Sequence, residues 1–163
     1  MKMIFDLDLD QCVACGACAV ACMDQNDIAP DNGDPMFRII GTLEPRVNSG
    51  AFSFLSLSCM HCTQAPCIPA CPVLCFRKDE RGLTVYDRTK CIGCHSCAMA
   101  CPYGAPKYAA DGKITKCTGC ADRQEYGYAP ACVRACPTKA LICVPESQYA
   151  QVKPSHSLRD QAT

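Results

Sequence analysis

The sequence contains no tryptophan, and aromatic residues make up only 7% of its 163 positions. A chain of this length folds as one compact unit or as two small ones. With so few large side chains, its apolar core is thin. Packing of side chains alone therefore does not account for a stable interior.

The sequence also lacks an export signal and a convincing membrane-spanning segment. The first five residues are followed at once by Asp6, Asp8 and Asp10, so no basic segment leads into an apolar one. The stretch from residue 47 to residue 76 carries no charge, but prolines at positions 66, 69 and 72 would break a helix there. We expect a soluble, cytoplasmic protein without direct membrane insertion.

Motifs for common enzyme and nucleic-acid chemistry are missing as well. We find no nucleophile elbow, phosphate loop or dinucleotide fingerprint. No basic run is interleaved with aromatic residues, so nucleic-acid binding has little support. We predict no catalytic residue in this chain.

What the sequence does have is cysteine, 18 in all. Sixteen of them form four quartets, and the first and third have the spacing C-x2-C-x2-C-x3-C. In that run, three thiolates hold one iron–sulfur cube and the fourth reaches a different cube. Proline follows the last cysteine of every quartet but the first, which has Met23. We predict four [4Fe–4S] clusters, with iron bound by Cys12, Cys15, Cys18 and Cys22, by Cys59, Cys62, Cys67 and Cys71, by Cys91, Cys94, Cys97 and Cys101, and by Cys117, Cys120, Cys132 and Cys136.

Two other uses of these cysteines fit the spacing less well. A disulfide framework does not require triads at three-residue intervals, and it belongs to oxidising compartments. Structural zinc, in a zinc-stapled interaction module, is the stronger rival because paired C-x2-C units form zinc sites. Zinc needs two pairs per ion, however, so a triad with a fourth cysteine would leave ligands without a metal.

Clusters change the charge of the protein and couple its folding to metal. The 16 basic and 16 acidic residues give a formal net charge of zero. Each cubane with its thiolates carries about −2 when oxidised, so four would bring the protein to about −8. We expect the chain to be largely unstructured without metal. Basic residues beside the third and fourth quartets would stabilise reduced clusters, or they form an ordinary solvated face: Lys107, Lys113, Lys116, Arg123, Arg134 and Lys139.

The quartets form an internal repeat separated by short apolar or alternating runs. Residues 11–26 align with residues 90–105 cysteine for cysteine. The intervening runs predict short strands, mainly in hairpins, and segments 19–25 and 98–102 have room for one or two helical turns. The fold class is therefore a loop-rich α+β fold. The predicted strands lie at 2–9, 37–43, 52–58, 83–87, 113–116 and 141–144.

The second and fourth quartets carry more than spacing. The segments SCMHCTQAPCIPACP (58–72) and KCTGCADRQEYGYAPACVRACPTKAL (116–141) resemble the iron–sulfur subunit of the DMSO reductase family of molybdenum and tungsten oxidoreductases. The resemblance covers roughly residues 3–145, by the limits of the repeat units. Similar small polyferredoxins accompany tungsten aldehyde oxidoreductases, formate dehydrogenases and some hydrogenases.

The resemblance implies tandem bacterial-ferredoxin-like dicluster units with pseudo-two-fold symmetry. Residues 1–46 plus 112–145 would form the first unit and residues 47–111 the second, followed by a polar tail at 146–163 that is disordered or ordered only by a partner. The first quartet would interlock with the fourth, and the second with the third. The implied ligand sets are Cys12, Cys15, Cys18 and Cys136; Cys22, Cys117, Cys120 and Cys132; Cys59, Cys62, Cys67 and Cys101; and Cys71, Cys91, Cys94 and Cys97.

Three residues near the quartets have less obvious roles. Cys75 aligns with alanine in two repeats and Cys143 lies in an apolar strand, so both are predicted to be small buried thiols rather than ligands. His61 lies inside a complete cysteine quartet. We therefore expect it to make a hydrogen bond to the site rather than bind iron.

A protein made mostly of clusters conducts electrons rather than transforming a substrate. We predict a non-catalytic electron-transfer subunit, active in anaerobic metabolism. It would pass single electrons between a Mo/W-pterin catalytic subunit, of the aldehyde oxidoreductase, formate dehydrogenase or DMSO reductase type, and a second redox subunit. The alternative is a freestanding or filament-forming polyferredoxin serving an aldehyde oxidoreductase, formate dehydrogenase or hydrogenase. Self-association into a homo-oligomer is a further alternative.

Overall fold

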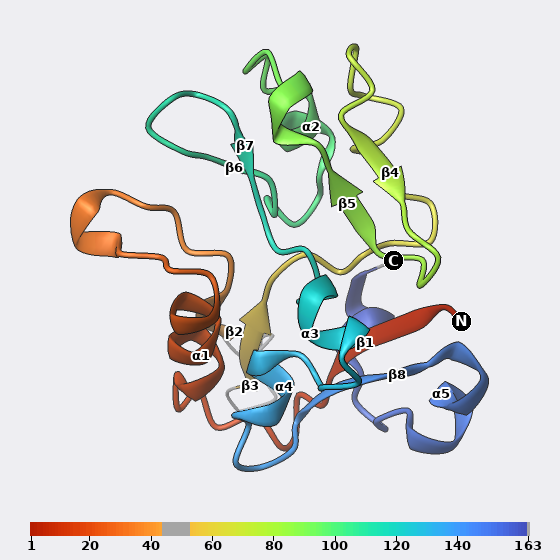
Figure 1. Cartoon of the computed structure of the whole chain (residues 1–163). Coiled ribbons are helices and arrows are strands. Elements are labelled where there is room, and N and C mark those ends of the chain that lie inside the picture. Colours follow the sequence, from red (N-terminus) through yellow and green to blue (C-terminus); the bar gives the residue numbers. More distant parts are fainter. Residues whose placement is uncertain (44–52, 163) are drawn as a thin grey trace.

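The computed structural model describes residues 1–43 and 53–162 as a loop-rich α+β fold (Figure 1). The strands form two-stranded antiparallel ladders, which pair β1 (Met3–Leu7) with β8 (Leu141–Pro145), β2 (Ile39–Leu43) with β3 (Ser53–Leu57), β4 (Phe76–Lys78) with β5 (Thr84–Tyr86), and β6 (Lys107–Tyr108) with β7 (Ile114–Thr115). The helices are short: α1 (Ala17–Gln25), α2 (Ser96–Ala100), α3 (Ala121–Glu125), α4 (Ala131–Arg134) and α5 (Glu146–Val152), with 3-10 turns η1 (Pro30–Asn32), η2 (Arg88–Lys90) and η3 (Leu158–Ala162). The predicted fold class is confirmed at this level.

The two ends of the chain lie side by side in the lower part of Figure 1. Strand β1 pairs with β8 in a register that sets Phe5 opposite Cys143 and Leu7 opposite Leu141. Helix α1 packs on α4 beside this ladder. The ladder is not a hairpin, because its strands come from opposite ends of the sequence. Because β1 precedes the first quartet and β8 follows the fourth, the ladder brings these two quartets close together.

A small core lies under this ladder. It consists of the aliphatic residues Leu7, Leu9, Ala140 and Leu141 packed with Cys18, Cys132 and Cys136. Each fully buried leucine contributes roughly 1.5–3 kcal/mol. Cysteine side chains therefore make up much of the interior, as expected for a chain that is poor in aromatic residues.

The upper part of Figure 1 holds the hairpins β4–β5 and β6–β7 together with α2. Its core contains Phe76 and Ile114 packed with Cys67, Cys71 and Cys97. All six predicted strand segments overlap an observed strand, but β4 and β6 were missed. These strands have only three and two residues, too few to show an alternating pattern.

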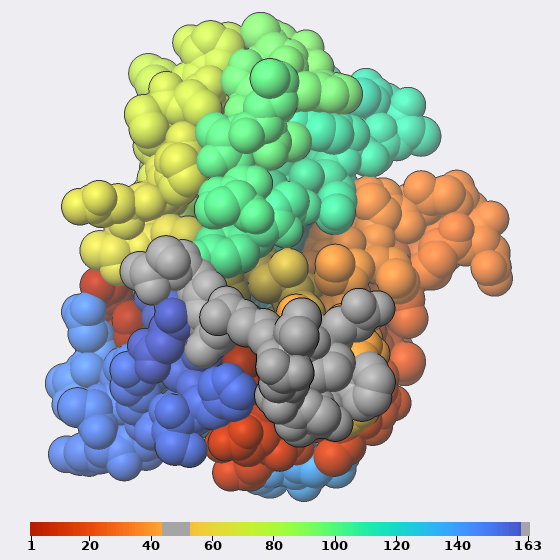
Figure 2. Space-filling view, turned by 180° about the vertical axis from the view of Figure 1, so that it is seen from behind, coloured from red at the N-terminus to blue at the C-terminus, as the bar shows by residue number. Residues whose placement is uncertain are grey.

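The C-terminal segment folds back onto the N-terminus, where Figure 2 shows it packed beside the first residues of the chain. The predicted disordered or partner-ordered tail is therefore wrong. Asp6 in β1 is only 2% exposed, and its carboxylate accepts hydrogen bonds from Tyr149 Oη and from Ser157 Oγ. The guanidinium of Arg159 donates to Phe5 O. A buried carboxylate needs such donors, and the polar composition of the tail supplies them.

No helix within the described residues is long and apolar enough to cross a membrane. The described part of the uncharged segment, from residue 53 to residue 76, holds β3, loops and the start of β4.

Candidate metal centres

Four cavities in the structure are each lined by four quartet cysteines, three from one quartet and one from another, and the cavity of site 4 is lined by Cys75 as well. We number them as sites. Site 1 has Cys12, Cys15, Cys18 and Cys136, and site 2 has Cys22, Cys117, Cys120 and Cys132. Site 3 has Cys59, Cys62, Cys67 and Cys101, and site 4 has Cys71, Cys91, Cys94 and Cys97. Their similar volumes, about 290 to 330 Å³ including the opening to solvent, indicate four sites of one kind.

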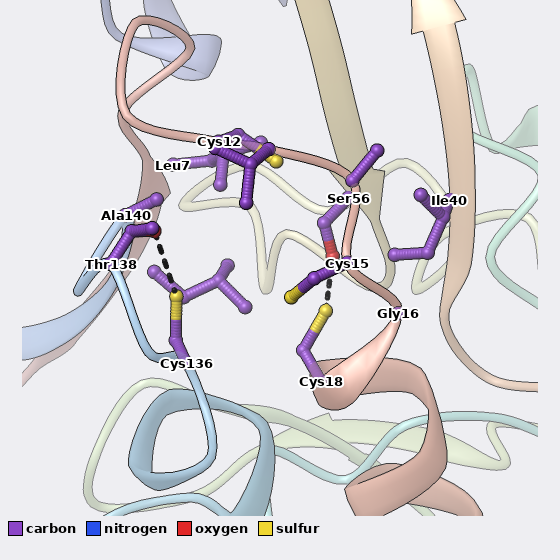
Figure 3. A pocket seen from close by; sticks show the side chains of 13 residues that line it. Leu7, Cys12, Cys15, Gly16, Cys18, Ile40, Ser56, Cys136, Thr138 and Ala140 are labelled. Carbon is purple, nitrogen blue, oxygen red and sulfur yellow. Dashed lines mark hydrogen bonds between the residues drawn. The ribbon is translucent and has the colours of Figure 1, made fainter.

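Site 1 shows how two distant segments form one cavity (Figure 3). Cys12 and Cys15 come from the loop that leads into α1, Cys18 lies in the first turn of α1, and Cys136 follows α4 on the opposite side in Figure 3. Cys18 Sγ lies 3.1 Å from Ser56 Oγ, and Cys136 Sγ lies 3.7 Å from Thr138 Oγ1. Cys136, the fourth thiol of site 1, thus belongs to a different quartet from the other three.

A left-handed residue shapes each cysteine loop. The third position of the first C-x-x-C turn in each quartet has a positive φ, with Ala14 at 52°, His61 at 45°, Gly93 at 69° and Gly119 at 76°. This conformation turns the backbone N–H groups of Gly93 and Gly119 toward the sulfurs of Cys91 and Cys117, at 3.4 and 3.3 Å. Hydrogen bonds of this kind stabilise negative charge on a thiolate.

The thiols differ in their exposure. Cys15 at site 1 and Cys94 at site 4 are exposed, whereas site 2 contains the buried thiols Cys22 and Cys132. Burial, reinforced by Cys117, raises the pKa of Cys22 to about 12, and burial raises the pKa of Cys132 to about 11. These thiols need a nearby positive charge, such as bound metal, to become thiolates at neutral pH.

Arg38 supplies a test of what site 2 can hold. This side chain is 5% exposed and lines the cavity of site 2. Its Nη1 donates to Ser56 O and Oγ, at 3.0 and 2.9 Å, but its buried Nε has no partner among the described residues. A buried cation with an unused donor is costly unless negative charge lies beside it. An iron–sulfur cluster with its thiolates, at about −2, supplies both charge and acceptors.

His61 lies in the ligand loop of site 3 but contacts a cysteine of site 2. Its Nδ1 accepts a hydrogen bond from the backbone N–H of Thr84 at 3.0 Å, and its Nε2 lies 3.8 Å from Cys117 Sγ. Burial lowers its pKa well below the usual value, and the nearby Lys116 lowers it further. The side chain is therefore a neutral hydrogen-bonding group at neutral pH.

Lys116 is the most deeply buried cation of this region, at 1% exposure. Its ammonium group donates to Thr84 O and to Cys117 O, and it lies 3.6 Å from Cys59 Sγ. The sequence showed Lys116 only as one of six basic residues near the third and fourth quartets, and it did not predict the contact with Cys59. It carried no signal for Arg38 or Ser56, because nothing in their local sequence separates them from other strand residues.

The two remaining cysteines occupy different surroundings. Cys75 is buried and lines site 4, and its backbone N–H donates to Cys71 Sγ at 3.2 Å. Cys143 is half-buried in β8, and burial raises its pKa to about 12. Their role as inert thiols stays a prediction. Within residues 1–43 and 53–162, no three His, Cys, Asp or Glu side chains converge closely enough to bind a single metal ion.

The chain is similar to known iron–sulfur proteins. Residues 51–145 match the family described as the 4Fe-4S dicluster domain. The chain belongs to the 4Fe-4S dicluster family. The predicted resemblance is thereby confirmed, and the family together with the 18 cysteines fits four [4Fe–4S] clusters.

Proteins that resemble this chain include parts of oxidoreductases. One polypeptide of the anaerobic dimethyl sulfoxide reductase of Escherichia coli is 38% identical, covering 84% of this chain and 70% of the relative. The thiosulfate reductase electron transfer subunit PhsB of Salmonella typhi is 38% identical, covering 82% and 71%. The formate dehydrogenase iron-sulfur subunit of Wolinella succinogenes is 35% identical, covering 86% and 80%.

Proposed function

We propose that this chain is the electron-transfer subunit of a molybdenum or tungsten oxidoreductase and holds one [4Fe–4S] cluster at each of sites 1 to 4. The observation that carries the proposal is the grouping of sixteen cysteines into four cavities, each built from two quartets. The ligands at each site are the four quartet cysteines that line it, and Cys75 at site 4 is not one of them. When bound, each cluster supplies a one-electron redox change.

The chain's own residues bind and tune these groups. The cysteine loops present three sulfurs to one side of each cavity, and the fourth arrives from another quartet. Backbone N–H groups, such as that of Ile114 at 3.3 Å from Cys91 Sγ, donate to the ligand sulfurs. Donors of this kind favour the more negative, reduced state and raise the reduction potential.

The grouping also supports the two-unit organisation inferred from the sequence. Sites 1 and 2 draw their ligands from residues 12–22 and 117–136, and sites 3 and 4 draw theirs from residues 59–101. We therefore retain residues 1–46 plus 112–145 as one ferredoxin-like dicluster unit and residues 47–111 as the other. The pseudo-two-fold relation between these units is part of the same proposal.

The proposed partners are a Mo/W-pterin catalytic subunit and a second redox subunit. The similar proteins named above are parts of dimethyl sulfoxide reductase, thiosulfate reductase and formate dehydrogenase. Exposed thiols at sites 1 and 4, Cys15 and Cys94, give electrons access from solvent-facing surfaces. Val13 and Ile92, each next to a ligand of those sites, are 56% and 65% exposed and offer apolar contact.

The test is anaerobic mixing of the full chain with the catalytic subunit of its complex. We expect the chain alone to accept electrons from dithionite and to convert no organic substrate. Adding the catalytic subunit should couple substrate oxidation or reduction to bleaching or recovery of cluster absorbance. Turnover of a substrate by the chain alone, or no exchange with the catalytic subunit, would overturn the proposal.

A further inference from the structure

The loops of sites 2 and 3 each carry a donor that reaches into the other site. Lys116 directly precedes Cys117, a site 2 cysteine, yet its ammonium lies 3.6 Å from Cys59 Sγ of site 3. His61 lies between Cys59 and Cys62 of site 3, yet its Nε2 lies 3.8 Å from Cys117 Sγ of site 2. The two contacts cross between the same pair of loops.

The tautomer of His61 follows from its contacts. Nδ1 accepts the backbone N–H of Thr84, so in the neutral ring the proton resides on Nε2. Nε2–H therefore points to Cys117 Sγ as a donor. The backbone of the opposite loop makes room for this ring, because a Cβ added at Gly119 would lie 3.3 Å from Nε2.

His61 also occupies a position where a side chain is unfavourable. Its φ is 45°, and the corresponding position in the other three quartets is glycine twice and alanine once. A bulky residue in the left-handed region costs about 1–2 kcal/mol. A contact that the smaller residues cannot make offsets this cost.

Among residues 1–43 and 53–162, the ammonium of Lys116 has no carboxylate as an ionic partner. Its contacts in the described part of the chain are the carbonyls of Thr84 and Cys117, the sulfur of Cys59 and the face of the Tyr86 ring, with no carboxylate among them. A cation buried this deeply needs negative charge nearby. The thiolate of Cys59, with the cluster charge behind it, supplies that charge.

A matched residue shows that the sequence motif alone does not produce this placement. Lys90 precedes Cys91 in the sequence K-C-x-G-C, as Lys116 precedes Cys117. The side chain of Lys90 is 61% exposed and lies 3.7 Å from Asp87. The fold has buried one lysine of the pair and left the other in solvent.

We propose that Lys116 and His61 form a reciprocal junction in which each residue, carried by the ligand loop of one site, raises the reduction potential of the cluster at the other. Lys116 acts on site 3 through its charge, and His61 acts on site 2 through its hydrogen bond. Both are positioning residues. The inference rests on the proposed clusters, so iron and sulfide are measured on every sample.

The test is a redox titration of the anaerobically purified full chain, followed by EPR. The variants are Lys116→Met, His61→Asn and the control Lys90→Met. Asparagine tolerates a positive φ, but its side chain is too short to reach Cys117. Cys59→Ser and Cys117→Ser identify the transitions of sites 3 and 2, because each alters the signal of its own cluster.

We expect Lys116→Met to reduce the equilibrium constant for reduction of site 3 tenfold or more, about 59 mV for one electron. His61→Asn should lower that of site 2 about threefold, in keeping with one lost hydrogen bond. Lys90→Met should change neither by more than about twofold, as expected for a screened surface charge.

A merely structural role would not lower the potential of site 3 in Lys116→Met and that of site 2 in His61→Asn. Unchanged potentials in both variants, or a shift of site 2 alone in Lys116→Met, would overturn the proposal. If Lys116→Met loses iron, the potential of site 3 is measured instead in Lys116→Gln, which keeps a hydrogen-bond donor but has no charge. Loss of site 3 iron from both Lys116 variants would overturn the proposal in favour of a structural role. Wild-type protein without four clusters' worth of iron and sulfide would instead refute the proposed function.

Discussion

Ser157 Oγ donates a hydrogen bond of 2.6 Å to Asp6 Oδ2, joining the last segment of the chain to its first strand. The two residues are 151 positions apart, and both are almost fully buried. This contact fixes the C-terminal segment against β1, whose partner β8 leads from the fourth quartet. The segment is thus part of the fold that holds sites 1 and 2.

Removing a donor to Asp6 should destabilise this end of the molecule. Ser157→Ala leaves the buried carboxylate with one hydrogen bond fewer, which costs about 1–3 kcal/mol. We expect cluster absorbance to be lost at a lower denaturant concentration. Lys153→Ala, which removes only an exposed ion pair with Asp160, should change the midpoint little. Equal midpoints for the Ser157→Ala variant and the wild type would show that the contact is unimportant.

The exchange of ligands between quartets predicts a crossed effect of Cys22→Ser. Cys22 lies in α1 next to the site 1 loop, but it lines site 2 with Cys117, Cys120 and Cys132. The substitution should alter or remove the site 2 cluster and leave site 1 unchanged. Iron content and EPR spectra measure this, with Cys117→Ser as the matched variant at the same site. A change confined to site 1 is incompatible with the interlocked arrangement.

Sequence reasoning identified the cysteines because their spacing is itself the chemical signal. It placed the strands at 2–9 and 141–144 but not their pairing, because spacing along the chain does not record contacts between distant ends. The tail was judged from polar composition, and its role became clear only through the buried Asp6. Arg38 was missed for the same reason: a single charged residue in the predicted strand 37–43, which lies just before β2, reveals neither its burial nor its partner.

Arg38 should stabilise the reduced state at site 2. Arg38→Met removes a buried positive charge that lines this site and leaves Ser56 O without its donor. We expect the potential of one cluster to fall by about 59 mV or more, a tenfold change in the reduction equilibrium. Arg77→Met, on the exposed side of β4, is the control. The same redox titration decides, and an unaltered potential in Arg38→Met means that no negative group lies beside the guanidinium.

The two cysteines outside the quartets should be dispensable. Alanine already occupies the position of Cys75 in two repeats, and Cys143 lines none of the four sites. The double variant Cys75→Ala and Cys143→Ala should keep its iron, sulfide and capacity to accept electrons. Cys71→Ala, at the thiol that receives the N–H of Cys75, should lose one cluster and serves as the positive control. Iron loss in the double variant would reveal an unrecognised ligand.

The central claim is that this chain holds four clusters and conducts electrons through them. The most direct measurement is a quantitative reductive titration of the anaerobically purified full chain, with iron and acid-labile sulfide determined on the same sample. We predict about four electrons accepted per chain, with about sixteen iron atoms and about sixteen sulfides. Stoichiometric zinc with little sulfide, and no electrons accepted, would contradict the account.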